Sequence, residues 1–150
     1  MLFDQKIIIL DEELPSATLA LTRLADSLQA AGQVNDQFKA ALLTRERQFP
    51  TGLQTKTLGV ALPHAAPEFV EHEQLGLLRL KRPVIFRQMG DNAEVAVQLV
   101  FILALKEPQQ QLAMLQALMQ FFQNEAAVQK LMTLTDQNDI ITLLASLGIK

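Results

Sequence analysis

The chain of 150 residues contains no cysteine, tryptophan or tyrosine. Without cysteine it has no thiol nucleophile, no disulfide and no thiolate ligand for a metal, and this composition fits a cytoplasmic protein. Its eight aromatic residues are all phenylalanine, and its net charge is −3 with no block of basic residues. Nucleic-acid-binding proteins usually present a cationic face with aromatic stacking platforms, so the composition disfavours nucleic acid as a partner.

Long apolar runs are also absent. The longest strictly apolar run, Leu99–Leu105, is far shorter than the roughly 20 residues that a membrane-spanning helix needs. The first residues lack a basic region that leads into a long apolar one, so we expect no signal peptide and no direct membrane insertion. Apolar residues nonetheless make up 49% of the chain. This length and content suffice for a real core, and we predict a single domain over residues 1–150.

Apolar patterning predicts the strands. Five short segments have the pattern of strands: Lys6–Leu10, Gly59–Leu62, Leu75–Leu80, Val84–Phe86 and Val97–Leu105. The third and fourth segments flank Lys81-Arg82-Pro83, and we expect them to form a hairpin. The last segment is apolar on both alternating faces, which predicts a central strand covered on both sides. Asp11-Glu12-Glu13 is interpreted as a solvated turn and not as a pair of catalytic carboxylates.

Capping residues and helical spacing predict the helices. Pro15 and Ser16 suit the start of the first helix and Gly32 its end. Asn35 can cap a second helix, which the segment Phe49–Gly52 ends. In the last third of the chain one helix carries an apolar stripe, and two shorter helices follow it. The stripe consists of Leu112, Leu115, Leu118, Met119 and Phe122, and the caps of the shorter helices are Asn124 and either Thr135 or Asp136.

The order of these elements is strand, two helices, several strands and then helices. This order predicts an α/β fold: a single domain with a mixed four- to five-stranded sheet covered by helices on both faces.

One of the two histidines, His64, directly follows the strand segment Gly59–Leu62 and Pro63. Proline cannot donate to a sheet ladder, so the strand should end there and His64 should lie at the rim of the sheet. Near neutral pH an imidazole is partly uncharged, and its free ring nitrogen is a nucleophile. The position therefore favours a histidine that accepts a group and passes it on.

Other chemistries of His64 match the sequence less well. His72 lies eight residues further, a span of roughly 26 Å in a strand or 12 Å in a helix, so the two rings cannot share a metal ion without a sharp turn. The carboxylates of Glu68, Glu71 and Glu73 have no familiar ligand spacing, and we expect no metal site. The chain has no Gly-x-Ser-x-Gly elbow, no Walker loop and no Gly-x-Gly-x-x-Gly, so serine hydrolysis and nucleotide binding have no visible motif.

Phosphoryl transfer requires fewer specialised residues than metal binding, serine hydrolysis or nucleotide binding. One ring nitrogen must be free while the other is fixed by an acceptor such as a backbone carbonyl. A cation must offset the roughly two negative charges that arrive with the phosphoryl group, and the planar guanidinium of arginine suits its oxygens well. Arg45 and Arg47 precede the turn Pro50–Gly52 and could fold back beside His64. On position alone, we interpret each as a solvated arginine at a helix end.

Two motifs together carry a family resemblance. The segment Leu42–Leu53, with its Arg45-Glu46 pair and Phe49-Pro50-Thr51-Gly52-Leu53, is followed by Gly59–His64. This constellation resembles the enzyme IIA components of the bacterial phosphoenolpyruvate-dependent sugar phosphotransferase system. It is similar to the fructose–mannitol superfamily, and within it to the galactitol-type branch. The resemblance implies one type-2 enzyme IIA domain over residues 1–150 that needs no cofactor.

The resemblance also implies partners and residue roles. His64 matches the histidine that accepts a phosphoryl group on Nε2 from HPr and passes it to a cysteine of enzyme IIB, for uptake of galactitol or a related sugar. Arg45 matches the arginine that stabilises the phosphoryl charge, and Glu46 its acidic neighbour, which we expect to orient that arginine. Thr51 matches the turn bordering the phosphate site. The protein would then be a phosphotransferase component.

The sequence departs from the family at several places. Gln111 stands where many relatives carry a second histidine, and its amide can still donate a hydrogen bond to the phosphate. His72 is either a shifted substitute for a family histidine or a surface residue. Ala65 and Ala66 follow His64 where galactitol-type relatives often have a polar residue and an acid. Two other readings therefore stay open: a regulatory IIA-like domain that is phosphorylated on His64 but signals, and an interaction module in which His64 is structural.

Overall fold

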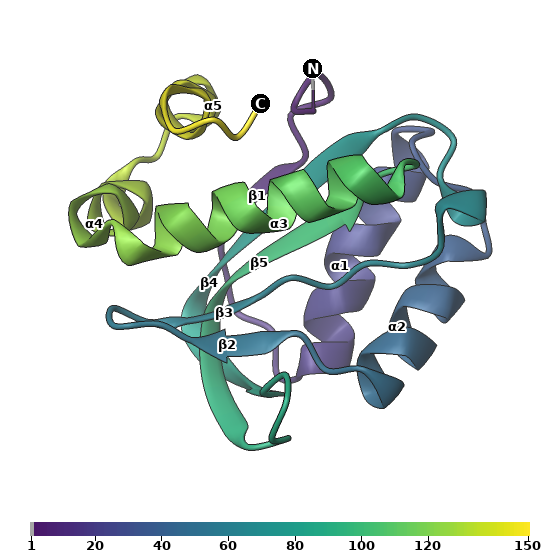
Figure 1. Cartoon of the computed structure of the whole chain (residues 1–150), viewed down its shortest axis with the longest axis horizontal. Coiled ribbons are helices and arrows are strands. Elements are labelled where there is room, and N and C mark those ends of the chain that lie inside the picture. The colour runs from purple at the N-terminus through teal and green to yellow at the C-terminus, as the bar shows by residue number, and fades with distance from the viewer. Residues whose placement is uncertain (1) are drawn as a thin grey trace.

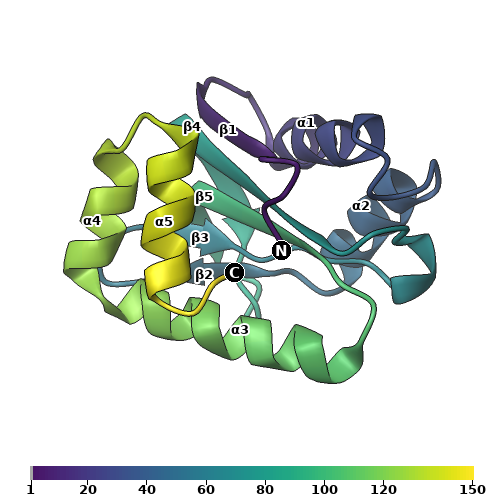
Figure 2. The ribbon, with the colours of Figure 1, turned by 90° about the horizontal axis from the view of Figure 1, so that it is seen from above.

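A five-stranded mixed sheet runs through the middle of the molecule and is covered by helices on both faces (Figures 1 and 2). The computed structural model describes residues 2–150. β1 is parallel to β4 and β3 is parallel to β5, whereas the β4–β5 and β2–β3 pairs are antiparallel. In spatial order the strands are β1 (Ile8–Glu12), β4 (Gln74–Arg87), β5 (Glu94–Ala104), β3 (Gly59–Ala61) and β2 (Gly52–Gln54). The predicted α/β class and mixed sheet are confirmed.

The helices form two layers, one on each face of the sheet. One layer contains α1 (Ala17–Ala30) and α2 (Phe38–Gln48), and the other contains α3 (Pro108–Gln123), α4 (Glu125–Thr133) and α5 (Gln137–Ser146). A short 3₁₀ helix, η1 (Pro67–Phe69), follows β3. Each layer encloses its own apolar core, and β5 contributes alternate residues to both. The apolar run at residues 99–105 is thus a central strand covered on both sides, as predicted.

Most predicted helix ends are confirmed. The side chains of Ser16, Asn124 and Asp136 accept hydrogen bonds from backbone N–H groups in the first turns of α1, α4 and α5. Gly32 follows α1 with a φ of 75°, in the left-handed region that glycine adopts without strain. Asn35 does not cap α2 directly. It accepts from the N–H of Gln37, and the helix begins one residue later.

The predicted hairpin around Lys81-Arg82-Pro83 is wrong. The segments on both sides of it lie in one strand, β4, and a β-bulge between Arg79 and Val84 takes up the extra residues. Pro83 is exposed in this bulge, where no ladder hydrogen bond is required of it. The hairpin instead joins β4 to β5 through residues 88–93, where Gly90 and Asn92 have positive φ.

The acidic segment after the first strand is also different from the prediction. β1 begins at Ile8 and continues through Glu12, so Asp11 to Glu13 is not a solvated turn. Asp11 bonds the guanidinium of Arg79, and Glu12 bonds that of Arg23. These carboxylates are partners of structural arginines at the edge of the sheet.

The buried face of α3 is rotated relative to the predicted stripe. Met114, Leu118, Phe121 and Phe122 are buried, whereas Leu112 is 58% exposed. The predicted and observed faces share Leu118 and Phe122, because residues four apart lie on the same side of a helix. Packing against the sheet and α4 determines which residues beside Leu118 and Phe122 are buried.

Candidate functional site

His64 lies where the short strand β3 ends. After Ala61 the chain continues beside β5, and the Leu103 N–H donates to the Pro63 carbonyl at 3.1 Å. His64 pairs with Leu103 as an isolated parallel bridge. The ring is therefore held at the carboxyl end of two parallel strands, the edge at which ligands bind in open α/β sheets.

The two ring nitrogens of His64 have different surroundings. Nδ1 lies 3.1 Å from the carbonyl oxygen of Leu62. Because a carbonyl only accepts, Nδ1 carries the hydrogen and Nε2 keeps its lone pair. The ring is half-buried, and this burial is the main cause that lowers its pKa from the ordinary histidine value. The neutral, nucleophilic form is therefore favoured at neutral pH.

His64 opens into a cavity of about 320 Å³. Arg45 reaches it from the last turn of α2, and Gln111 from the beginning of α3. Lys106 and Glu107, which sequence reasoning missed, come from the link between β5 and α3. Their only signal was that charged residues directly follow the apolar run of β5. The apolar part of the wall is formed by Ala65, Ala66, Pro67, Leu105 and Pro108.

Arg45 supplies a positive charge without a carboxylate partner. Within residues 2–150, none of the salt bridges involves Arg45. Its guanidinium carbon lies 5.2 Å from the ring centroid of Phe49, a cation–π contact that holds the side chain without neutralising it. Its charge also contributes to the lowered pKa of His64. An anion bound at His64 would therefore meet a guanidinium that no carboxylate of residues 2–150 holds in a salt bridge.

Gln111 presents a donor that lacks an acceptor. Its Nε2 is buried and has no hydrogen-bond partner among the described residues. A buried polar group without a partner costs roughly 1–3 kcal/mol, and such groups are rare in folded proteins. The Gln111 side chain also lines the His64 cavity, next to this unpaired donor.

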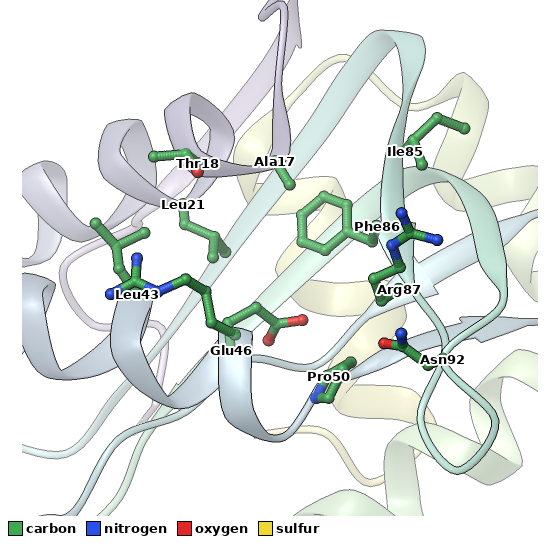
Figure 3. A pocket seen from close by; sticks show the side chains of 11 residues that line it. Ala17, Thr18, Leu21, Leu43, Glu46, Pro50, Ile85, Phe86, Arg87 and Asn92 are labelled. Carbon is green, nitrogen blue, oxygen red and sulfur yellow. The ribbon is translucent and has the colours of Figure 1, made fainter.

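Glu46 does not bond Arg45, contrary to the expected role. Its carboxylate accepts from the Thr51 N–H at 2.9 Å and from the Thr51 hydroxyl at 2.8 Å. It lines a second hollow of about 340 Å³ between α1, α2 and β4 (Figure 3). Burial raises the pKa of Glu46, and the two bonds from Thr51 oppose that rise.

Thr51 does not line the His64 cavity either. The residue is 7% exposed, and its hydroxyl bonds both Glu46 and the Leu62 N–H. Its N–H and its hydroxyl are therefore both engaged within the protein, and binding of phosphate by Thr51 stays a prediction. Thr51 contacts Leu62, whose carbonyl accepts from Nδ1 of His64.

His72 is exposed and lies elsewhere. It lines a different hollow with Gln33, Gln74 and Gln110, so it does not contribute to the His64 cavity. Across residues 2–150 no three His, Cys, Asp or Glu side chains are grouped so that they could hold a metal ion. In the same part of the chain, none of the helices has the length and apolar content needed to span a bilayer.

Residues 1–147 match the family described as "Phosphoenolpyruvate-dependent sugar phosphotransferase system, EIIA 2". The chain belongs to this family. Membership of the EIIA 2 family gives it a general role in phosphoryl transfer within a sugar phosphotransferase system.

Individual proteins with similar sequences or structures are consistent with this family. The chain is 36% identical over 116 residues to the "PTS system galactitol-specific EIIA component" of Escherichia coli (strain K12), which covers 77% of each chain. It is 27% identical over 143 residues to the "Transcriptional regulator ManR" of Bacillus subtilis (strain 168), covering 94% of this chain and 20% of the regulator. The EIIA fold is shared with the mannitol enzyme IIA of Escherichia coli, solved in complex with phosphorylated enzyme IIB. That structure has a TM-score of 0.77 at 20% identity and covers 94% of this chain and 95% of its own.

Proposed function

We propose that this EIIA chain is a phosphocarrier that accepts a phosphoryl group from phospho-HPr on Nε2 of His64 and passes it to a cysteine of an enzyme IIB. The sugar taken up would be galactitol or a related one, and the chain would act in the cytoplasm as one type-2 domain over residues 1–150. The observation that carries the proposal is a histidine with Nδ1 held by Leu62 and Nε2 free, in a cavity that Arg45 also lines.

The transfer step balances without a further reactant. The Nε2 lone pair of His64 attacks phosphorus and forms a P–N bond, while the P–N bond to the donor histidine breaks and its electron pair returns to the donor ring. His64 then carries the phosphoryl group on Nε2 and a hydrogen on Nδ1. The Leu62 carbonyl accepts that N–H and stabilises the positive charge on the ring. Attack by a thiolate of enzyme IIB releases the neutral ring again.

Two side chains would stabilise the phosphoryl group. Arg45 offsets its roughly two negative charges because no carboxylate among residues 2–150 competes for the guanidinium. Gln111 donates from Nε2 to a phosphoryl oxygen, which supplies the acceptor that this buried amide lacks. The similarity to a mannitol enzyme IIA that was solved with its phosphorylated enzyme IIB supports the choice of acceptor.

The test is phosphoryl labelling with phosphoenolpyruvate, enzyme I and HPr. We expect acid-labile phosphate on the wild-type protein and none on His64→Ala. Arg45→Ala should slow labelling by about a hundredfold, the range of losses seen when one charge-stabilising donor is removed. Arg47→Ala is the matched control, because Arg47 lies in the same helical turn but does not line the cavity. Absence of label from the wild type, or equal rates for the two arginine variants, would contradict the proposal.

Gln111 allows a separate test in the same reaction. Gln111→Leu fills the space but removes the donor, and we expect labelling to slow by about tenfold, the equivalent of one hydrogen bond to a charged group. Gln111→His restores a donor at this position and should recover most of the rate. An unchanged rate in Gln111→Leu would remove Gln111 from the site.

A regulatory domain is the second candidate. The cavity wall beside His64 is apolar at Ala65 and Ala66, and nearly the whole chain matches part of a transcriptional regulator. Such a domain would take label on His64 but would not deliver it. Addition of a cognate enzyme IIB separates the two candidates: a phosphocarrier loses its label to the acceptor cysteine, whereas a signalling domain retains it.

A further inference from the structure

A chain of hydrogen bonds links Glu46 to the ring of His64. The Thr51 hydroxyl donates to Glu46 Oε1 at 2.8 Å, and Oγ1 of the same hydroxyl accepts from the Leu62 N–H at 3.2 Å. The Leu62 carbonyl then holds Nδ1 of His64 at 3.1 Å. This series of hydrogen bonds starts in the last turn of α2, passes through the residue before β2 and ends just after β3.

We propose that Glu46 is a positioning residue for His64, which acts through the Thr51 hydroxyl and the backbone of Leu62. This inference rests on the proposed function, because it assigns Glu46 and Thr51 to the histidine that receives the phosphoryl group. It replaces the expected contact between Glu46 and Arg45. It also gives Thr51 the role of holding the Leu62 backbone, in place of a role in the phosphate cavity.

The position of Pro63 explains why Leu62 needs this support. The Leu62 carbonyl belongs to a peptide bond whose nitrogen is that of Pro63, which has no N–H. That peptide therefore cannot be anchored through its own nitrogen. Its nearest anchors are the Pro63 carbonyl, which accepts from Leu103, and the Leu62 N–H, which bonds Thr51. The Leu62 N–H also donates to the Thr51 backbone carbonyl at 3.3 Å, so loss of the Thr51 hydroxyl would weaken this anchor without removing it.

Glu46 fixes the direction of the Thr51 hydroxyl. A hydroxyl has one hydrogen and two lone pairs. Because the carboxylate takes the hydrogen, a lone pair is left for the Leu62 N–H. The carboxylate also accepts from the Thr51 N–H, so it holds both the backbone and the side chain of this residue. Figure 3 shows Glu46 reaching from α2 into the hollow on the side of Pro50 and Phe86.

Two pairs of variants test the proposal. Thr51→Val keeps the shape but removes the hydroxyl, whereas Thr51→Ser keeps the hydroxyl. Glu46→Ala removes the acceptor, whereas Glu46→Gln can accept from the Thr51 N–H and donate to its hydroxyl oxygen, which can still accept from Leu62. We expect labelling by phospho-HPr to slow by about tenfold in Thr51→Val and Glu46→Ala, less than the roughly hundredfold that a 1 Å misplacement can cause. The two conservative variants should stay within about threefold of wild type on the same reasoning.

The spectroscopic signature of the His64 ring separates positioning from a loss of stability. In ¹⁵N-correlated NMR spectra the wild-type ring should be held as the Nδ1–H tautomer. Thr51→Val and Glu46→Ala should show a mixture of tautomers at temperatures where circular dichroism reports a folded protein. If Thr51→Val does not fold, the Glu46 pair decides the question with the same two measurements.

The outcomes distinguish this inference from the proposed function. A wild-type protein that takes no label refutes the phosphocarrier proposal and this inference with it. Labelling of the wild type, together with wild-type rates and ring signals in Thr51→Val and Glu46→Ala, refutes the positioning role alone. A Glu46→Gln rate as low as that of Glu46→Ala would assign Glu46 a role through its charge and would overturn the proposed route through Thr51.

Discussion

Replacement of Arg79 by methionine should strongly destabilise the fold while leaving the His64 site intact. Arg79 lies on β4 and is 3% exposed. Its guanidinium donates to both oxygens of Asp11, at 2.9 and 2.8 Å, and to the carbonyls of Leu131 and Leu134, at 2.8 and 2.6 Å. One side chain thus ties β1, β4 and the end of α4 together, with its charge near the negative end of that helix.

The size of the effect follows from these partners. Methionine fills much of the same volume but leaves two backbone carbonyls without a donor, at roughly 1–3 kcal/mol each. Asp11 is 54% exposed and can return to water, so it adds little. We expect a loss of about 4 kcal/mol, which comes from the two carbonyls left without a donor. In a domain of this size that loss lowers the Tm by about 12 °C.

Thermal unfolding followed by circular dichroism measures the shift. Arg82→Met is the matched control on the same strand, because Arg82 is highly exposed and its one ion pair within residues 2–150 is with Glu13, at 3.3 Å. An exposed pair of this kind contributes about 0–1 kcal/mol. Asp11→Asn should lie between the two, since the Leu131 and Leu134 carbonyls keep their donor. Equal shifts in Arg79→Met and Arg82→Met would refute the reasoning, and the folded Arg79→Met protein should still take label on His64.

Three further measurements check other parts of the structure. An NMR titration of the His64 ring should have its midpoint below that of free histidine, because burial lowers its pKa, and a midpoint at or above that value would contradict the described burial. Gly59→Ala should destabilise the fold by about 3 kcal/mol, since the added Cβ would overlap the carbonyl oxygen of Ala96; chemical denaturation that finds no loss would contradict the close contact between β3 and β5. Finally, the hydrogen bond from Arg79 lowers the pKa of Asp11 in the folded state, so its stabilisation is complete at neutral pH and is lost as the pH falls through that lowered value. The difference in Tm between wild type and Asp11→Asn should therefore shrink in acid, and a constant difference would refute the linkage.

Features determined by neighbouring residues could be predicted from the sequence. The caps at Ser16, Asn124 and Asp136 each bond N–H groups within three residues, so short segments contain the whole signal. The surroundings of His64 are also partly local, because Pro63 ends the strand and the acceptor of Nδ1 is only two residues away. For these helix caps and for the end of the strand before His64, the prediction and the structure agree.

Features that depend on distant segments could not be predicted in this way. A proline after charged residues indicates a turn, yet Pro83 lies in a bulge because β5 continues to pair on both sides of it. The contact of Glu46 with Thr51, five residues away, is local, and adjacent residues of a helix such as Arg45 and Glu46 do not face each other. The sequence still did not show that Thr51 is the partner. That choice depends on how the chain leaves α2 and enters β2.

The His64 cavity draws Arg45 from the helical layer on one face of the sheet and Gln111 from the layer on the other. Neither layer alone can assemble it. A partly folded chain in which only one layer has docked would have the histidine but not both of its companions. If His64 accepts a phosphoryl group as proposed, a chain emerging from the ribosome would be labelled only slowly until α3 has packed against the sheet, so the labelling rate would report on complete folding.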